Sequence, residues 1–420
     1  MNKIKQYPSY KDSKIKWIGE IPEQWSSHRI KDFVEFEIGG TPSTSNEEFF
    51  EGNNIWISIA DLTNNNKNTI NNSKTKITDE AIKKSNVKLI KKGSLLFSFK
   101  LTVGETAFAG CDLYTNEAIA SFKQNKNISL NYLKYLFKVG FENNAFENIY
   151  GAKIFNSDLI KFAKIIKPSF IEQEQIAKYL DTKTTKIEQT ITKNKKLIDL
   201  LEEKRTSLIN QVVIKGFNPN VKMKDSGIEW IGEIPEDWDV SKLKFFFNFG
   251  KGLSITKKNL VEKGISIISY GQIHSKLNKG INVTKELIRY VNKKDIPNFK
   301  SKVKKNDFIF ADTSEDLDGC GNAVYIDKDI LLFAGYHVVV LKSKINKDNK
   351  YLAYLFKSST WRSQIRSKVT GVKVYSINQK ILKESYILIP SLAEQKQIAD
   401  YLDKETSKID KTIEKIEKKY

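Results

Sequence analysis

The sequence predicts two mixed α/β (α+β) domains in tandem, each followed by a long helix. Three observations carry this prediction. Most of the chain is written twice, at an offset that drifts from 213 to 222 residues. Each copy ends on a seven-residue apolar repeat, and the middle of each copy alternates short strand-like and helix-like runs.

The repeat is clearest at the two ends of each copy. DSKIKWIGEIPEQW at 12–25 returns as DSGIEWIGEIPEDW at 225–238, and PSFIEQEQIAKYLDTKTTKIEQTI at 168–191 returns as PSLAEQKQIADYLDKETSKIDKTI at 390–413. By contrast, GGTPSTSNEEFFEGNNIWISIADL at 39–62 has no close copy. The ends are therefore predicted to share one task, and the middles to perform different ones.

The two long helices are predicted from their first residues and their periodicity. Ser169 with Glu172, and Ser391 with Glu394, have the spacing of a helix capping box after a proline. A heptad seam follows, and such a seam requires a helical partner, for which the other copy's helix is the candidate. Polar Asn194 and Arg205 either fix its register or mark where the partner is missing. The predicted seam residues are Leu180, Ile187, Asn194, Leu201 and Leu208, with Leu402, Ile409 and Ile416 in the second copy.

The middles, at about 26–165 and 239–388, contain strand-like runs such as SLLFSFKLTV and DFIFAD, and short helices such as LNYLKYLFK. The predicted organisation is a first domain at 1–167, a helix at 168–216, a second domain at 217–389 and a shorter helix at 390–420. A helix of about 45 residues would be some 65–70 Å long.

Composition restricts the class of partner and the compartment. The chain carries 70 Lys and Arg against 50 Asp and Glu, a net charge of +20, which favours a polyanionic partner or reflects an AT-rich genome. Two cysteines without metal-ligand spacing suit a reducing compartment. No secretory leader and no long apolar run is visible, so a cytoplasmic protein without a membrane partner is expected.

Catalytic signatures are not found in the sequence. The three histidines lack metal-ligand spacing, and no phosphate-binding loop motif occurs. GCGNAV at 319–324 lacks the third glycine of a dinucleotide fingerprint. EEK at 202–204 resembles the tail of a nuclease motif, but it lies on the predicted coiled-coil helix, where a solvated face is expected. We therefore expect a protein that recognises a ligand, with no catalytic residue and no metal or cofactor of its own.

The sequence resembles the specificity (S) subunits of type I restriction–modification systems. The resemblance is carried by WIGEIPEQW and WIGEIPEDW, by GGTPSTSNEEFFEGNNIWISIADL, by LLFSFKLTVGETA with TNEAI, and by PSFIEQEQIAKYLD and PSLAEQKQIADYLD. With the two-copy layout, it covers nearly the whole chain.

The resemblance implies two target-recognition domains, each reading half of a split double-stranded DNA sequence. It also implies an antiparallel coiled coil that spaces them, two methyltransferase (M) subunits bound around it, and restriction (R) subunits in the full complex. S-adenosylmethionine, ATP and Mg²⁺ would belong to those partners. The second helix lacks a counterpart of Asp199–Ile214, so weaker docking of one M subunit is expected.

DNA-contacting residues are predicted in polar and basic loops, because Gln and Arg can contact bases in pairs of hydrogen bonds and Lys can contact phosphates. The alternative for each is an ordinary solvated side chain. The predicted set is Thr41, Ser43, Ser45, Lys100 and Lys153 in the first domain, and Gln272, His274, Lys276, Arg362, Arg366 and Lys373 in the second. Trp17, Ile21 and Trp25 are predicted to pack the joint between helix and domain.

Three alternatives stay open. The chain could be an S-like subunit of another restriction or methylation enzyme, or an orphan DNA-binding S subunit. It could be a basic two-domain scaffold for RNA or protein. A catalytic nuclease is disfavoured because no carboxylate cluster is placed to bind a metal.

Overall fold

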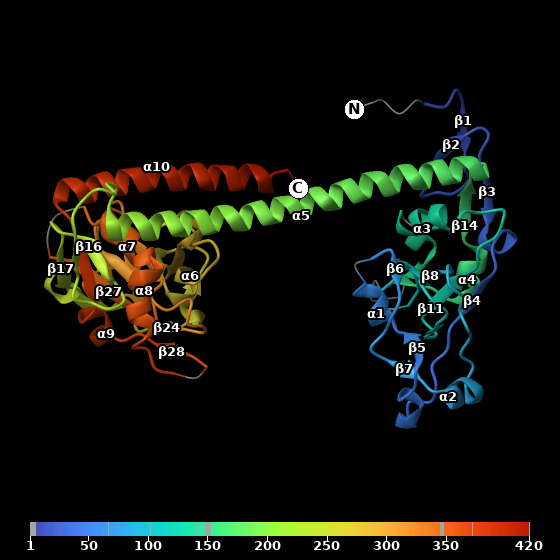
Figure 1. Ribbon diagram of the computed structural model, residues 1–420, viewed down its shortest axis with the longest axis horizontal. Helices are drawn as coiled ribbons and strands as arrows, with labels where there is room; N and C mark the ends of the chain where they lie inside the picture. The colour runs from blue at the N-terminus through green and yellow to red at the C-terminus, as the bar shows by residue number, and fades with distance from the viewer. Residues whose placement is uncertain are drawn as a thin grey trace. The chain divides into compact units, whose positions relative to one another are not determined.

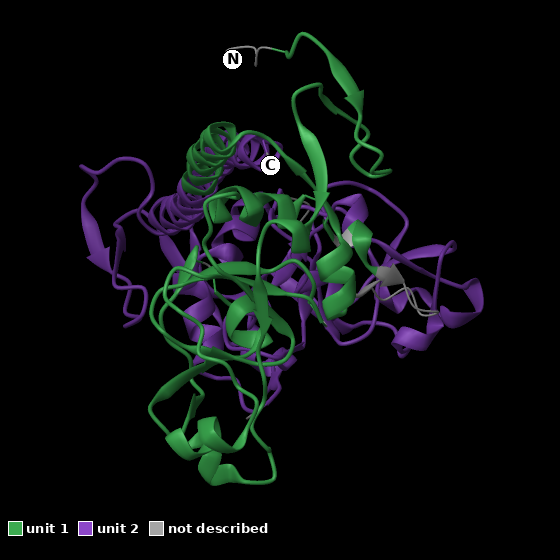
Figure 2. Ribbon diagram, turned by 90° about the vertical axis from the view of Figure 1, so that its right-hand side faces the viewer, with its two compact units in different colours: residues 1–190 green, residues 191–420 purple. Residues whose placement is uncertain are grey.

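The computed structural model describes residues 6–65, 67–100, 102–139, 141–147, 153–344, 348–371 and 373–419. The chain divides into unit 1, residues 1–190, and unit 2, residues 191–420 (Figure 2). The boundary falls within the long helix α5 (Phe170–Lys215), whose first half packs on unit 1 and whose second half packs in unit 2.

Unit 1 is built on a five-stranded sheet in the order β4-β11-β8-β9-β6 (Figure 1). Leu95 and Phe97 of β8 face helix α3, whereas Leu96 between them faces a second apolar cluster, as strand geometry requires. Both faces of this sheet are therefore buried. Its strands are β4 (Phe36–Ile38), β6 (Thr69–Ile70), β8 (Leu95–Ser98), β9 (Thr106–Ala109) and β11 (Ile119–Phe122).

A smaller sheet in the order β10-β5-β7 and several two-stranded pairs complete unit 1. These strands are β1 (Tyr10–Asp12), β2 (Glu20–Pro22), β3 (Ser26–Arg29), β5 (Asn54–Ile57), β7 (Lys76–Ile77), β10 (Tyr114–Thr115), β12 (Phe146–Glu147), β13 (Lys153–Ile154) and β14 (Lys164–Lys167). The helices are α1 (Ile59–Thr63), α2 (Asp79–Lys84), α3 (Leu130–Lys138), α4 (Ser157–Phe162) and α5.

Unit 2 repeats this plan with a four-stranded sheet, β18-β27-β23-β25, in the order of β4-β11-β8-β9. Phe308 and Phe310 face helices α7 and α8, and Ile309 faces the opposite apolar cluster. The strands are β18 (Phe247–Lys251), β23 (Phe308–Ala311), β25 (Ala323–Tyr325) and β27 (Val338–Ser343). The helices are α6 (Tyr270–Ile273), α7 (Lys350–Lys357), α8 (Ser359–Arg366), α9 (Gln379–Lys383) and α10 (Leu392–Glu417).

A five-stranded sheet, β19-β21-β20-β26-β22, covers the other face, and its β20–β26 pair is parallel like β5–β10 in unit 1. Its strands are β19 (Leu260–Val261), β20 (Ile265–Ile268), β21 (Arg289–Val291), β22 (Lys302–Val303) and β26 (Leu332–Ala334). Two-stranded pairs join β15 (Met223–Asp225) to β16 (Glu233–Pro235), β17 (Asp239–Lys242) to β29 (Tyr386–Ile389), and β24 (Thr313–Ser314) to β28 (Tyr375–Ser376).

The repeated tryptophan phrase joins each unit to its long helix. Trp25 donates its indole N–H to Glu172 Oε1 at 3.3 Å, and Trp238 donates to Glu394 Oε2 at 2.9 Å. Both glutamates stand in the first turn of the helix, where a carboxylate also offsets the unpaired backbone N–H groups. The phrase therefore fixes the start of each helix against its own unit.

A second tether repeats about two and a half turns further along each helix. Asp181 accepts from Lys134 Nζ at 2.8 Å and Tyr135 Oη at 2.6 Å. In unit 2, Asp403 accepts from Lys350 Nζ and Tyr354 Oη, both at 2.7 Å. The tyrosines and aspartates are matching repeat positions, but the lysines are not, because Ala353 replaces Lys134 and Lys350 stands one turn earlier.

Within unit 2, the second half of α5 and α10 form an antiparallel helix pair (Figure 1). The end of α5 lies near the start of α10, since a Cβ on Gly216, which directly follows α5, would lie 3.1 Å from Glu394 Oε1. Arg205, nearer the N-terminus of α5, forms an ion pair at 2.6 Å with Asp410, which is nearer the C-terminus of α10. The seam predicted for α10 is buried at Leu402, Ile409 and Ile416.

Candidate nucleic-acid interface

The two units place their predicted contact residues around equivalent loops of the central sheet. In unit 1, the loop after β8 and the residues before β11 meet the segment after β4. The pairing of the strands identifies the residues of unit 2 that correspond to those of unit 1. Ile119 of β11 pairs with Ser98 of β8, and Val338 of β27 pairs with Ala311 of β23 in the same way. Glu117 and Ala118 therefore correspond to Tyr336 and His337.

In unit 1, Thr41 and Lys100 come together at Glu117. Thr41 donates its hydroxyl to the Glu117 carboxylate. That hydrogen bond, with the nearby Lys100 charge and against the effect of burial, holds the pKa of Glu117 below its usual value. Gly39 permits the close approach, since a Cβ there would lie 2.2 Å from the Thr115 carbonyl oxygen. Glu117 lies in the TNEAI run, but its role beside Thr41 could not be predicted from that run.

The other predicted residues of unit 1 stand apart from this cluster. Ser43 and Ser45 are exposed and bond to each other through their hydroxyl oxygens at 2.7 Å. Lys153 lies in β13 by its backbone, but its side chain is outside the described residues. Its repeat counterpart, Lys373, is exposed beside β28.

In unit 2, the polar groups of Gln272 and His274 turn inward. Gln272 Oε1 accepts the Ser269 backbone N–H at 3.2 Å in a capping box at the start of α6. His274 Nε2 lies 2.8 Å from the Thr313 carbonyl oxygen, so Nε2 carries the proton and Nδ1 accepts from the Asn322 amide at 3.1 Å. Lys276, two residues on, is exposed.

Arg362 and Arg366 on α8 clamp the loop that follows β24. Arg362 donates to the carbonyl oxygens of Cys320 and Asp318 and to the Asn322 side chain. Arg366 Nη2 donates to Asp318 O at 3.0 Å. Burial, with the neighbouring Arg366 charge, lowers the pKa of Arg362 to about 10. Their role as base readers stays a prediction, because both guanidinium groups hold the loop in this structure.

The β5–α1 segment, for which the sequence showed no close copy, has a structural counterpart in unit 2. Ser58 caps α1 with Asp61 in a capping box, and Ser269 caps α6 with Gln272 in the same way. Both helices follow a buried strand of the second sheet. The shared signal was the serine followed three residues later by an acceptor side chain.

The seam residues of α5 differ in burial. Leu201 and Leu208 are half-buried, and Arg205 is paired with Asp410. Leu180 and Asn194 are half-buried, whereas Ile187 is 58% exposed. Position 187 therefore lacks the covering that its counterpart Ile409, 7% exposed, receives in unit 2.

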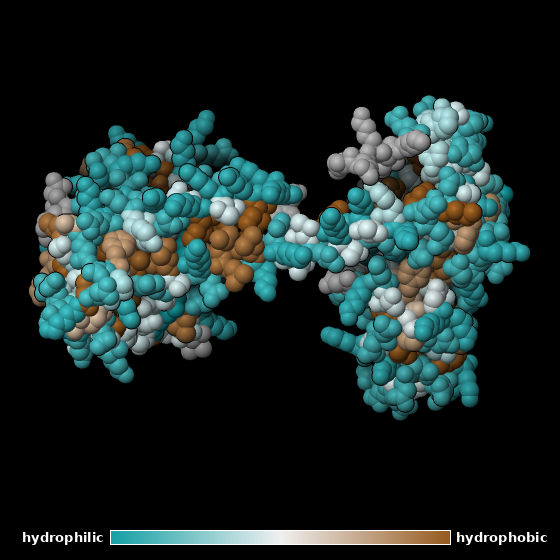
Figure 3. Space-filling view, turned by 45° about the horizontal axis from the view of Figure 1, so that its top comes forward, coloured by the Kyte–Doolittle hydropathy of each residue, from teal (hydrophilic) through white to brown (hydrophobic). Residues whose placement is uncertain are grey.

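Two further properties concern only the part of the chain that the structure describes. No group of three or more His, Cys, Asp or Glu side chains there is arranged to hold a metal ion. None of its helices combines the length and apolarity needed to cross a bilayer. The face shown in Figure 3 is mostly hydrophilic, with hydrophobic patches on each unit.

The duplicated fold and the paired polar loops define a two-domain recognition protein. Comparison with protein families gives the particular class. The family model described as the type I restriction modification DNA specificity domain matches twice, at residues 22–198 and 235–419. The chain therefore belongs to the family of type I restriction–modification specificity subunits, and it carries two recognition domains.

Relatives in sequence and structure agree with this membership. The chain is 26% identical over 379 residues to the type I restriction enzyme MjaIX specificity subunit of Methanocaldococcus jannaschii, covering 89% of this chain and 84% of the relative. It is 27% identical to the putative MjaX specificity subunit of the same organism, covering 94% and 90%.

Two solved structures share the fold. One, from a study of complex assembly and conformational transition of the type I R–M system, superimposes with a TM-score of 0.69 at 15% identity, covering 95% of this chain and 94% of the other. The HsdS subunit of Thermoanaerobacter tengcongensis gives a TM-score of 0.56 at 13% identity, covering 94% and 92%.

Proposed function

We propose that each unit reads one half of a bipartite double-stranded DNA target. The observation that carries the proposal is the duplicated scaffold with different side chains at equivalent loops. Glu117, with Thr41 beside it, and Ala118 occupy in unit 1 the positions that Tyr336 and His337 occupy in unit 2. Two copies of one framework with different polar surfaces suit two different half-sites.

The net charge of +20 supports a nucleic-acid partner, because lysine and arginine bind phosphates without regard to sequence. Sequence would be read in the major groove, where all four base pairs differ in their pattern of donors and acceptors. A helix of 46 residues, the length of α5, is roughly 70 Å long, about two turns of B-DNA. We assign α5 and α10 the task of setting the spacing between half-sites.

In this proposal the long helices also dock methyltransferase subunits, and exposed heptad positions of α5 such as Ile187 form part of that contact. In this proposal the chain itself is not catalytic. S-adenosylmethionine, ATP and Mg²⁺ serve the methyltransferase and restriction subunits.

Methylation mapping tests the proposal. The chain is produced with its methyltransferase subunit in a host that lacks other DNA methylation, and the modified sites are sequenced. A bipartite motif with a fixed gap is expected. A continuous motif, or an active complex without a motif, would contradict two separate readers. Equal binding of random RNA and duplex DNA by the purified chain would favour the scaffold alternative.

A further inference from the structure

A cleft of about 790 Å³ opens in unit 2 at the loops just described. Tyr270 of α6 lines one side, and His337, which precedes β27, lies beside it. Glu315 lines the cleft from the loop after β24, and Val374 from the residue before β28. The cleft therefore lies where the loop after β23, the turn before β27 and the β24–β28 pair meet.

One wall of the cleft is made of rings. The Tyr270 ring lies 5.3 Å from the His337 ring at an interplanar angle of 80°, and 5.8 Å from the Tyr336 ring. His337 has a φ of 54°, a left-handed conformation that is costly for a residue with a side chain. Its side chain is nevertheless 60% exposed. Unit 1 has Ala118 at this position, so the ring wall belongs to unit 2.

The donors of His274 and Arg362 are engaged within the protein, and three carboxylates line the cleft: Glu315, Asp316 and Asp318. Asp316 accepts from the Gly319 backbone N–H and Asp318 pairs with Arg366, which leaves Glu315 as the carboxylate without a partner among the described residues. Both ring nitrogens of His274 and the guanidinium of Arg362 bond to the protein. Glu315 is exposed and forms no hydrogen bond with any described residue. The cleft can therefore accept a hydrogen bond more readily than it can donate one.

Lysines stand at the rim of this cleft. Lys251 is exposed, and its charge acts on the carboxyl of Asp312, which is paired at 3.6 Å with His337. Lys373 is exposed and directly precedes the lining residue Val374. Phosphates at the rim would be attracted, whereas a carboxylate inside would disfavour any base edge that offers only acceptors.

We propose that this cleft reads one base of the second half-site by its exocyclic amino group, cytosine N4 or adenine N6, which donates to Glu315. Tyr270 and His337 form the wall against which that base edge packs. A carboxylate is the side chain suited to an amino group in the major groove. The inference rests on the proposed function and specifies the chemistry of one position in it.

Selection from a pool of randomised duplexes with the purified full chain tests it. The enriched consensus is remade with each cytosine replaced by 2-pyrimidinone or each adenine replaced by purine, which lack only the amino group. Wild type is expected to lose about tenfold in affinity at one such position in one half-site, the scale of one hydrogen bond. Loss with 2-pyrimidinone identifies cytosine, and loss with purine identifies adenine.

Glu315→Ala should bind the intact consensus about tenfold more weakly and show no further loss when that amino group is removed. Glu315→Gln, which keeps an acceptor oxygen, should recover part of the affinity. Glu262→Ala, an exposed glutamate of the same unit, serves as the matched control and should behave as wild type. If Glu315→Ala enriches the same consensus as wild type at every position, this inference is wrong and the proposed function still stands. If wild type enriches no consensus, the proposed function fails with it.

Discussion

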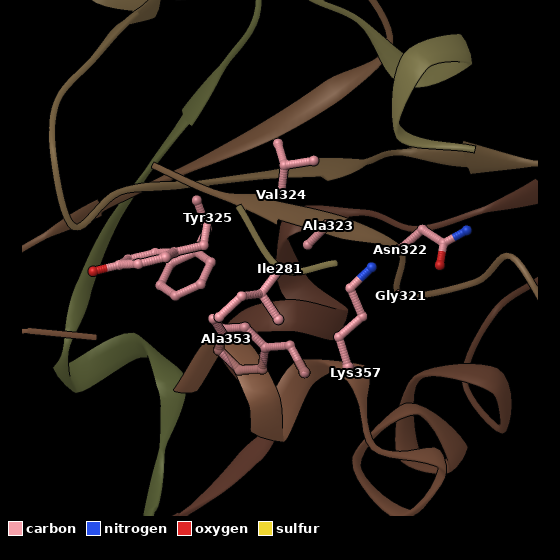
Figure 4. A pocket seen from close by; sticks show the side chains of 10 residues that line it. Ile281, Gly321, Asn322, Ala323, Val324, Tyr325, Ala353 and Lys357 are labelled. Atoms are coloured by element: carbon pink, nitrogen blue, oxygen red, sulfur yellow. The ribbon is translucent and has the colours of Figure 1, made fainter. Parts of the chain in front are cut away.

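At the scale of single residues, the half-buried Lys357 places an amino group among apolar side chains. It ends α7, and its side chain extends toward Gly321 and Asn322 (Figure 4). Its Nζ donates to the Asn278 carbonyl oxygen at 3.4 Å, and Lys357 forms no salt bridge with any described carboxylate. Burial, with the charges of Arg362 and Arg205, lowers the pKa of Lys357 to about 7.

The lowered pKa makes the stability of unit 2 depend on pH. Between pH 7 and about 10.5, the unfolded chain holds a proton on Lys357 that the folded chain lacks. The free energy of unfolding should therefore rise with pH in this window, by up to about 1.4 kcal/mol for each pH unit. Lys357→Met should remove this slope and be more stable at pH 7. Urea denaturation from pH 7 to 10 measures it, with exposed Lys380→Met as control. An unchanged slope in Lys357→Met would refute the assignment.

The turn before each repeated tryptophan phrase offers a matched pair of positions. Lys14 has a φ of 57° where its counterpart Gly227 has 69°, and both backbone N–H groups bond to the preceding aspartate. The left-handed conformation costs a residue with a Cβ roughly 1 kcal/mol. Lys14→Gly should therefore stabilise by about 0.5 kcal/mol after the loss of chain entropy, and Gly227→Ala should destabilise by about 1 kcal/mol. Thermal unfolding measures both changes, with Lys14→Ala as a neutral control. A neutral Gly227→Ala would contradict the account.

The kinds of residue at the candidate site could be predicted from the sequence better than their partners could. Thr41 and Lys100 were selected as loop residues, and their meeting at Glu117 depends on a sheet that joins three distant segments. Arg362 is predicted for its ability to bond bases, and His274 belongs to the same predicted set. Their present partners lie on the loop at 313–322, about 40 residues or more away, which no local pattern indicates.

At the scale of elements, the Asp181 and Asp403 tethers hold each long helix to its unit. The Asp181 carboxylate is partly buried, yet hydrogen bonds from Lys134 and Tyr135 hold the pKa of Asp181 below its usual value. Asp403→Ala should cost about 1 kcal/mol, and a double-mutant cycle with Tyr354→Phe should show coupling of similar size. Urea denaturation provides these values. Asp400→Ala, exposed on the same helix, should be neutral, and additive effects in the cycle would argue against the tether.

The heptad seam makes a sharper contrast between its two copies. Ile409 is 7% exposed against the second half of α5, and its counterpart Ile187 is 58% exposed. Ile409→Ala should therefore destabilise the isolated chain by about 2–4 kcal/mol, whereas Ile187→Ala should change its stability by less than about 0.5 kcal/mol. Denaturation of the two variants side by side compares them. Equal losses would mean that the seam is covered equally along its length.

Elements were predictable where the physical signal is local. Capping serines and heptads predict helices at 168–216 and 390–420, and the structure has α5 at Phe170–Lys215 and α10 at Leu392–Glu417. The lysine of the tether could not be predicted from the repeat. Lys134 pairs with Asp181 and Lys350 pairs with Asp403, although the two lysines are not at matching positions of the repeat. The extent of helix pairing also depends on tertiary structure. The heptad periodicity shows that each helix needs a partner, but it does not show where the partner helix ends.

At the scale of the whole molecule, the proposed function makes the excess of 20 positive charges the main source of affinity for DNA. Phosphate contacts release counterions, so affinity should fall steeply as salt rises, and it should do so for every sequence. Base contacts add discrimination that salt changes far less. The two contributions can therefore be separated by residue.

Lys373 and Glu315 provide that separation. Lys373→Ala should weaken binding of the selected duplex and of a random duplex by similar factors and reduce the salt slope by about 1, because one phosphate contact is lost. Glu315→Ala should weaken only the selected duplex and leave the slope unchanged. Fluorescence anisotropy titrations from about 50 to about 200 mM salt measure the affinity and the salt slope of each variant. Lys380→Ala serves as the control. A Lys373→Ala variant with an unchanged slope would place this lysine away from the phosphates. Because Lys373 corresponds to Lys153 in the repeat, the same slope change is expected of Lys153→Ala.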